Sequence, residues 1–330
     1  MGGLSTEEQP EALASVAMFL AILGVVLGLA LLTFAADQFV VGATRVAATL
    51  RLSTVVIGAL VIGFGTSAPE IVVSGLAAGR GQMDLAAGNV IGSNVANLTL
   101  VLGAAALVGP IVVHSRTLKR EAPLSLAAVA LFGLLLQGGL SLLDGVLLGL
   151  ALVGSLVLVL MSARGGDPDL ESEVGEYLTT ALPPLRIEAT RTLLALVGVV
   201  VSAQILVVSA GDIAARFGIS EGFVGFTIVA IGTSLPELAT ALQAARRQET
   251  DLIVGNLLGS NLFNATAVGT VIAFAGPSRP VSAALAGPAT WLMVGVAAVT
   301  FVFMITGRRV ARSEGVVLLL AYLAVLPLLL

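Results

Sequence analysis

The chain has 330 residues, of which 57% are hydrophobic before its 38 glycines are counted and only 11% are charged. Soluble domains carry about 25% charged residues, so these proportions exclude a soluble globule and indicate a polytopic integral membrane protein. The chain has no cysteine and one histidine, which excludes disulfide scaffolds, thiol catalysis and soft-metal sites. No phosphate-binding loop occurs, which argues against nucleotide hydrolysis. We also expect no enzymatic activity, no cofactor and no nucleic-acid partner.

Apolar stretches predict ten membrane spans, because about 20 apolar residues cross a bilayer as a helix. We expect the first span to extend as an amphipathic helix through Arg45. The expected fold is an all-α polytopic membrane protein with ten transmembrane helices in two halves, 1–163 and 190–330, joined by an acidic linker, 164–189. In chain order the spans cover residues 14–36, 53–78, 84–108, 119–137, 141–162, 190–212, 221–245, 250–274, 284–306 and 313–330.

The basic residues orient these spans in the membrane. On the side of the two termini the loops hold three of the 16 lysines and arginines, and on the other side they hold thirteen. Loops rich in lysine and arginine stay in the cytoplasm. This predicts a multi-pass protein of the plasma (inner) membrane, with both termini outside and the 164–189 linker in the cytoplasm. The lipid bilayer is its expected surrounding, and the sequence indicates no oligomeric state.

Residues 63–97 recur as residues 230–264. At a constant offset of 167 without gaps, 16 of 35 positions are identical, including G-T-S-x-P-E and G-N-x-x-G-S-N. An odd number of spans separates the copies, so they are expected to cross the membrane in opposite directions. Inverted repeats around a site at the membrane midplane are a transporter architecture.

Two glutamates, Glu70 and Glu237, fall near the centres of spans in matching positions of the repeat. An acid at that depth is costly and marks a functional site by default. Each follows a proline, Pro69 or Pro236, which lacks an N–H and clashes with the preceding turn. Both spans should therefore break there and restart at the proline, with hydroxyls at the break from Thr66, Ser67, Thr233 and Ser234.

Four more polar residues form two pairs, Ser93 with Asn97 and Ser260 with Asn264. Each pair is spaced i, i+4 and shares one helix face. If that face looks toward the glutamates, the pairs complete a shell made only of oxygen ligands. Such a shell suits hard cations, and Ca²⁺ takes six to eight oxygens in flexible geometry. Two glutamates neutralise one Ca²⁺, and Na⁺ ions occupying the same oxygens in alternation would give obligatory exchange.

The remaining motif residues have structural interpretations. Gly88-x-x-x-Gly92 and Gly255-x-x-x-Gly259 are small-x-x-x-small patterns that favour close helix packing. Asp84 and Asp251 are expected to cap the N-termini of the third and eighth spans. The motif asparagines at 89, 94, 256 and 261 are expected to join helices by hydrogen bonds.

These paired motifs resemble the two α-repeats of the cation/Ca²⁺ antiporter superfamily, in particular prokaryotic sodium/calcium exchangers. The resemblance implies that Glu70 and Glu237 are the central Ca²⁺ and Na⁺ ligands. It also implies coordination by Thr66, Ser67, Thr233, Ser234, Ser93, Asn97, Ser260 and Asn264, and by the carbonyls of Gly63 and Ala230. Family members typically move three Na⁺ against one Ca²⁺, with the first and sixth helices sliding across the core.

One departure from the family pattern concerns Asn264, where K⁺-dependent relatives place an aspartate. Both copies here end in asparagine, which argues against K⁺ dependence. The proton-coupled branch usually shows G-N-A-x-E, which is absent here. An antiporter coupled to H⁺ or moving another divalent cation, a cation channel, and a non-transporting scaffold are the alternatives to Na⁺/Ca²⁺ exchange.

Overall fold

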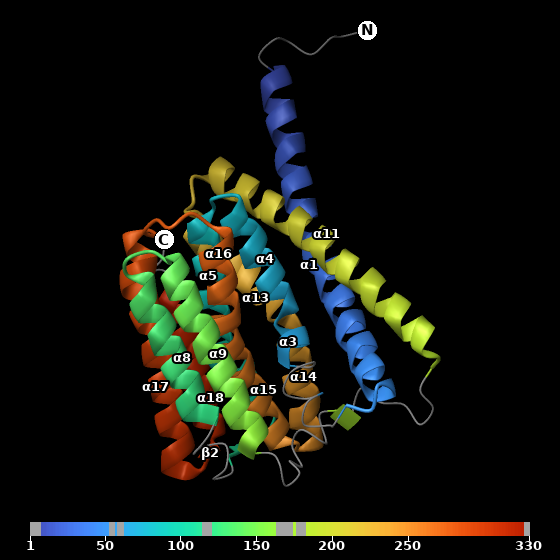
Figure 1. Cartoon of the computed structure of the whole chain (residues 1–330). Helices are drawn as coiled ribbons and strands as arrows, with labels where there is room; N and C mark the ends of the chain where they lie inside the picture. Colours follow the sequence, from blue (N-terminus) through green and yellow to red (C-terminus); the bar gives the residue numbers. More distant parts are fainter. Residues whose placement is uncertain are drawn as a thin grey trace.

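A computed structural model describes residues 8–52, 57, 63–113, 121–162, 174–175 and 183–326, with side chains of the first helix described from Ser15. The described residues are mainly helical and include one antiparallel ladder of two short strands, β1 (Ile111–Val112) and β2 (Arg309–Val310) (Figure 1). In chain order the helices are α1 (Glu8–Thr49), α3 (Gly63–Thr66), α4 (Ala68–Gly79), α5 (Met83–Ala96), η2 (Asn97–Val101), α6 (Leu102–Val108), α8 (Glu121–Leu136), α9 (Leu142–Ser162), α11 (Leu185–Phe217), α12 (Glu221–Val224), η3 (Gly225–Val229), α13 (Ala230–Thr233), α14 (Leu235–Arg247), α15 (Thr250–Phe263), η4 (Asn264–Val268), α16 (Gly269–Ala275), η5 (Leu285–Ala289), α17 (Thr290–Gly307) and α18 (Arg312–Val325).

Six helical stretches are long and apolar enough to cross a membrane, or seven if the bent pair Glu221–Thr233 and Leu235–Arg247 is one span. These counts concern only the described residues, and two shorter apolar helices, α4 and α8, fall below the length required. The fold is therefore an all-helical multi-pass one, whereas the count of ten remains a prediction.

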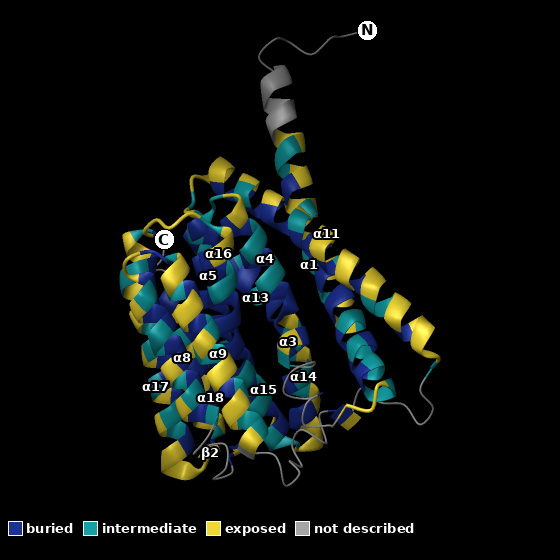
Figure 2. Ribbon diagram, in the orientation of Figure 1, coloured by how far each residue is buried: buried dark blue, intermediate teal, exposed yellow. Residues whose placement is uncertain are grey.

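The second half of each repeat motif lies at the centre of the bundle. The continuous stretches Met83–Val108 and Thr250–Ala275 are 83% and 78% buried inside the protein, far more than the other candidate spans. Exposed apolar side chains instead cover the outer faces of α1, α9 and α11 (Figure 2). Lipid-facing apolar residues explain this exposure, since a helix satisfies its own backbone and needs only an apolar surface in a bilayer.

Helices α1 and α11 form a long antiparallel pair on one flank of this core (Figure 1). Glycines line their contact: a Cβ on Gly28 would lie 3.1 Å from the backbone nitrogen of Leu206, and one on Gly42 would meet Thr192 at 2.5 Å. Small residues allow helix backbones to approach closely in a membrane. Near the C-terminal end of α1, Arg45 forms an ion pair with Glu188, which lies near the N-terminal end of α11.

The observed ends of α1 and α11 can be compared with the predicted spans and linker. Helix α1 continues through Arg45 to Thr49, as expected. Helix α11 begins at Leu185, five residues before the expected span, so the end of the expected linker is helical and Glu188 is completely buried. The rest of the linker lies outside the described residues, apart from 174–175.

The expected capping role of Asp84 and Asp251 is wrong. Helix α5 begins at Met83 and is preceded by Gln82, which places Asp84 inside the first turn. Its carboxylate instead accepts a hydrogen bond of 2.9 Å from the backbone N–H of Ser282. Asp251 likewise lies inside the first turn of α15, after Glu249. Both aspartates thus lie inside the first turn and not at the N-cap position, where their negative charge is stabilised by the positive end of the helix dipole.

Candidate functional site

Both prolines of the repeat interrupt a helix as the sequence predicts. Ser67 separates α3 from α4 with φ −86° and ψ 5°, and Ser234 separates α13 from α14 with φ −88° and ψ 6°. Each helix restarts one residue before the proline, which occupies the first turn, where its missing N–H costs nothing. The second break bends the chain by 46°.

The two broken helices point in opposite directions in the view of Figure 1, where α3 lies below α4 whereas α13 lies above α14. Helix α3 packs on α15, and α13 packs on α5, so each break lies against the second half of the other repeat. The repeat motifs therefore meet at the centre of the bundle, although they are 167 residues apart in sequence.

Glu70 and Glu237 occupy the first turns of the restarted helices and are 1% and 2% exposed. The helix N-terminus favours a negative charge at this position. Burying an ionised carboxylate costs free energy unless the carboxylate is protonated or paired with a cation. No arginine or lysine is paired with either glutamate in the described part of the chain.

Buried oxygen atoms that accept or donate no hydrogen bond within the described part of the chain gather in the repeat motifs. Such atoms are costly in a protein interior unless another partner binds them. Most of the residues predicted for the site contribute one. These atoms are Ser67 Oγ, both carboxylate oxygens of Glu70, Asn97 Oδ1, Ser234 Oγ, Glu237 Oε2, Ser260 Oγ and Asn264 Oδ1.

Hydrogen bonds between the repeats surround Thr233. Its Oγ1 lies 3.3 Å from two acceptors, Asn89 Oδ1 and the carbonyl of Ala230, and 3.4 Å from Ser93 Oγ. Asn89 in turn donates to Ser74 Oγ of α4 at 2.9 Å. Ser93 of α5 thus faces the second broken helix, whereas Asn97, at the start of η2, donates a hydrogen bond to Asn261 of α15. The sequence did not single out Ser74.

The two breaks differ in exposure. Thr233 and Ala230 are buried, whereas their counterparts Thr66 and Gly63 are only partly buried. The local hydrogen bond is the same in both repeats: Thr66 Oγ1 lies 3.4 Å from the carbonyl of Gly63, and Thr233 Oγ1 lies 3.3 Å from the carbonyl of Ala230. The first repeat therefore presents its hydroxyl and carbonyl oxygens to a more open environment than the second.

Asn97 and Asn264 each begin a π-helical segment, η2 and η4. Such segments widen the helix locally and are frequent at functional sites. The identical placement in both repeats points to a shared local geometry at these two amides. Neither apolar periodicity nor spacing contains a signal for it.

Glycines bring α5 against the second broken span. A Cβ on Gly88 would lie 2.5 Å from the carbonyl oxygen of Gly222, and one on Gly92 would lie 2.7 Å from Phe226 Cα. Close packing is therefore confirmed for this glycine pair. The offset matches Gly222 and Phe226 with residues 55 and 59, which lie outside the described residues, so packing at Gly255 and Gly259 stays a prediction.

Helix α1 passes over both breaks. A Cβ on Gly65 would lie 2.9 Å from Val40 Cγ2, and one on Gly232 would overlap the side chain of Leu29. These two contacts are eleven residues apart on α1, or about 16 Å at 1.5 Å per residue. A single helix thus covers the two halves of the site.

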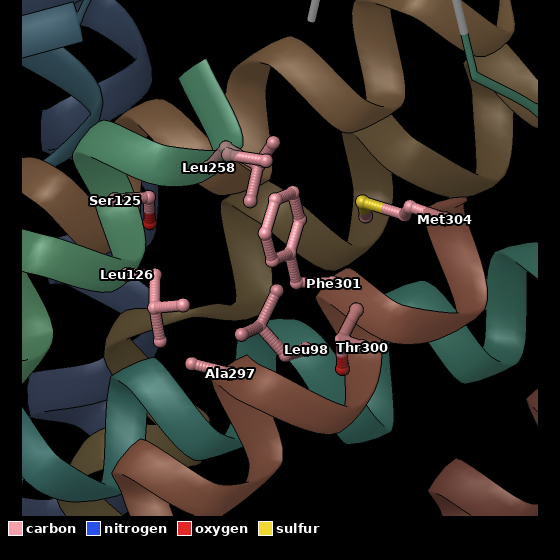
Figure 3. Close-up of a pocket in the computed structure, with 9 residues that line it drawn as sticks. Leu98, Ser125, Leu126, Leu258, Ala297, Thr300, Phe301 and Met304 are labelled. Atoms are coloured by element: carbon pink, nitrogen blue, oxygen red, sulfur yellow. The ribbon is translucent and has the colours of Figure 1, made fainter. Parts of the chain in front are cut away.

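A small pocket lies between η2, α8, α15 and α17, outside the repeat site (Figure 3). Its lining is mostly apolar, with two hydroxyls, Ser125 and Thr300, and it contains none of the predicted cation ligands. Thr300 Oγ1 is buried and has no hydrogen-bond partner within the described residues. The lining residues are Leu98, Ala122, Ser125, Leu126, Leu258, Ala297, Thr300, Phe301 and Met304.

Comparison with known proteins identifies the family. The model described as "Sodium/calcium exchanger protein" matches residues 20–161 and 189–330, which is most of the chain. The chain belongs to the sodium/calcium exchanger family. It is 42% identical over 316 residues to the putative antiporter CaxA of Alkalimonas amylolytica, covering 93% of this chain and 97% of that protein. It is 29% identical over 340 residues to the sodium/calcium exchanger MaX1 of Methanosarcina acetivorans, covering 92% and 96%.

The fold also matches a solved member of the exchanger family. The sodium-calcium exchanger NCX_Mj, soaked with Na⁺ and Sr²⁺, superposes with a TM-score of 0.65 at 29% identity, covering 94% of this chain and 99% of that one. The resemblance inferred from the paired motifs is thereby confirmed. Family membership supports cation/Ca²⁺ antiport by a multi-pass membrane protein and gives no indication of enzymatic activity or of a cofactor.

Proposed function

We propose that the chain exchanges Na⁺ for Ca²⁺ by alternating access and extrudes Ca²⁺. The observation that carries the proposal is the set of buried oxygens without hydrogen-bond partners in the two repeat motifs, which includes carboxylate oxygens of both Glu70 and Glu237. Hard cations bind such oxygens, and Ca²⁺ tolerates irregular arrangements of six to eight of them. Two glutamates neutralise one Ca²⁺, which offsets the repulsion between them.

Each predicted site residue has a role in this proposal. Glu70 and Glu237 are the central ligands shared by Ca²⁺ and Na⁺. The hydroxyls and amides contribute neutral oxygens, and the carbonyls of the broken helices complete the Na⁺ sites. The neutral ligands are Thr66, Ser67, Ser93, Asn97, Thr233, Ser234, Ser260 and Asn264, with the carbonyls of Gly63 and Ala230.

The moving part in this proposal is the pair α1 and α11. Their glycine-lined contact and the Arg45–Glu188 ion pair favour movement as one body. The contacts of α1 with Gly65 and Gly232 place this body over both breaks. Sliding along its axis would uncover one break and cover the other, which gives each side of the membrane access in turn.

The proposed topology has ten spans in two inverted halves, 1–163 and 190–330, with repeat motifs 63–97 and 230–264. The two separate stretches matched by the family model support this division. The distribution of basic residues supports termini outside, the 164–189 linker in the cytoplasm, and residence in the inner membrane. Exchange of three Na⁺ for one Ca²⁺ would carry net charge and respond to voltage by about 2.3 kcal/mol per charge per 100 mV.

A direct test of the shared site is competition between the two ions. Ca²⁺ binding to the purified full-length protein is measured by calorimetry at increasing Na⁺, with choline replacing Na⁺ at constant ionic strength. If Ca²⁺ and Na⁺ occupy the same site, the apparent Ca²⁺ dissociation constant should rise with the Na⁺ concentration, with a dependence steeper than first order. A dissociation constant that ignores Na⁺ but changes with pH would instead favour coupling to H⁺.

A further inference from the structure

Three asparagines link α5 to α15 by a chain of buried hydrogen bonds. Asn261 Nδ2 donates to the backbone carbonyl of Asn94 at 3.1 Å. Asn97 Nδ2 donates to Asn261 Oδ1 at 3.0 Å. All three side chains are at most 1% exposed. Asn97 is one of the proposed cation ligands, whereas Asn261 is not.

The backbone carbonyl of Asn94 determines the direction of this series of hydrogen bonds. A backbone carbonyl can only accept, so the Asn261 amide must turn its NH₂ group toward Asn94. Its Oδ1 then faces Asn97, which must respond with its own NH₂ group. The remaining atom of the Asn97 amide is Oδ1, which is buried and has no hydrogen-bond partner within the described residues. One carbonyl thus fixes the orientation of two side-chain amides.

We infer that Asn261 is a positioning residue that holds the Asn97 amide with its oxygen toward the cation site. The inference rests on the proposed function. Asn97 shares a helix face with Ser93, which lies 3.4 Å from Thr233 at the second break. A half-turn of the Asn97 amide would exchange oxygen for NH₂ at nearly the same shape, and NH₂ cannot bind a cation. Asn261 prevents this exchange by occupying the NH₂ group.

The other repeat supplies a matched control. Asn94 holds the same motif position as Asn261, but its Nδ2 donates to Val90 in its own helix at 2.8 Å. Its Oδ1 has no hydrogen-bond partner in the part of the chain that the structure describes. Only the backbone carbonyl of Asn94 takes part in the hydrogen bonds that join Asn97, Asn261 and Asn94, and Asn94→Ala keeps that carbonyl.

The test measures Ca²⁺ binding to purified full-length variants by calorimetry. Loss of an orienting hydrogen bond to a ligand predicts that Asn261→Ala raises the Ca²⁺ dissociation constant about tenfold. Asn261→Leu, which fills the volume with an apolar side chain, should do the same. Asn94→Ala, which keeps the carbonyl that accepts from Asn261, should raise the dissociation constant clearly less than either Asn261 variant. Asn261 variants that match Asn94→Ala would overturn the inference.

A double-mutant cycle separates positioning from a general packing role. Asn97→Asp presents an oxygen in either orientation, so it no longer needs Asn261. Adding Asn261→Ala to Asn97→Asp should therefore change the dissociation constant by less than about twofold. An equal loss in both backgrounds would assign Asn261 to packing and contradict the inference.

The two proposals fail in different ways. If the wild-type protein binds no Ca²⁺, or transports none in proteoliposomes under a Na⁺ gradient, the proposed function fails. If the wild type binds and transports Ca²⁺ while Asn261→Ala and Asn261→Leu behave like Asn94→Ala, only the positioning role fails. Size-exclusion profiles of each variant in detergent identify any that do not fold, and the Leu variant then carries the test.

Discussion

Arg45 on α1 and Glu188 on α11 form an ion pair of 3.3 Å across the contact between the two helices. Glu188 is completely buried and also pairs with Arg191 of its own helix at 3.3 Å. A carboxylate buried between two partly exposed arginines ties the ends of the helices together. The pair is 143 residues apart in sequence, so neither residue alone indicates it.

Replacing Glu188 should therefore destabilise the α1–α11 pair. Glu188→Ala leaves two arginines facing each other without their carboxylate, and we expect a loss on the order of 2 kcal/mol, reduced by the partial exposure of both arginines. Thermal unfolding in detergent measures this loss as a lower melting temperature. Glu188→Gln, which keeps the shape, should show a smaller decrease. An unchanged melting temperature in Glu188→Ala would mean that the ion pair does not hold the helices together.

The close contact of α5 with η3 gives a prediction for Gly92. A methyl group there would press on the backbone of Phe226 and on Ala230, so Gly92→Ala should cost about 1–3 kcal/mol and reduce transport. Gly295→Ala in α17 is the matched control, because no described atom lies within 4 Å of its added Cβ. Thermal unfolding of both variants provides the comparison. Equal stability of the two variants would show that the α5 contact tolerates a Cβ.

The two central carboxylates should be individually required. Glu70→Gln and Glu237→Gln each remove one negative charge from the proposed site while keeping its shape. We expect each to reduce Na⁺-driven Ca²⁺ flux on the order of a hundredfold, because a divalent cation would lose half of its compensating charge. Flux into proteoliposomes, normalised to reconstituted protein, checks this. Near-normal flux in either variant would place the site elsewhere.

Asparagine at position 264 predicts independence from K⁺. Replacing K⁺ by choline on both sides of the membrane should change Na⁺-driven Ca²⁺ flux by less than about twofold. Flux that disappears without K⁺ would show that an aspartate at this position is not what K⁺ dependence requires.

The sequence predicted those parts of the site that strong local chemistry specifies. Pro69 and Pro236 break their helices as predicted, and a glutamate beside each proline is the signal from which the site was proposed. Proline alone is not sufficient, because Pro288 lies inside a continuous helical stretch. The same reasoning misplaced Asp84, because the helix begins one residue earlier and the carboxylate binds Ser282 from a distant segment. A cap depends on the start of a helix to within one residue, which apolar patterns do not define.

Tertiary contacts explain the other features that the sequence did not reveal. Neither apolar pattern nor residue spacing indicates the π-helical turns that begin at Asn97 and Asn264. The direction of the Asn97 amide depends on a carbonyl in its own helix and on Asn261 in another one. The motif predicted that these asparagines join helices, but only the spatial arrangement distinguishes Asn261 from its counterpart Asn94.

The most direct measurement is Ca²⁺ uptake into proteoliposomes loaded with Na⁺ and diluted into Na⁺-free buffer, with Glu70→Gln as the control. Obligatory exchange predicts rapid Ca²⁺ uptake that requires internal Na⁺, ceases when Na⁺ is equal on both sides, and is absent in the control. Uptake that persists without a Na⁺ gradient and follows a pH gradient instead would contradict the account.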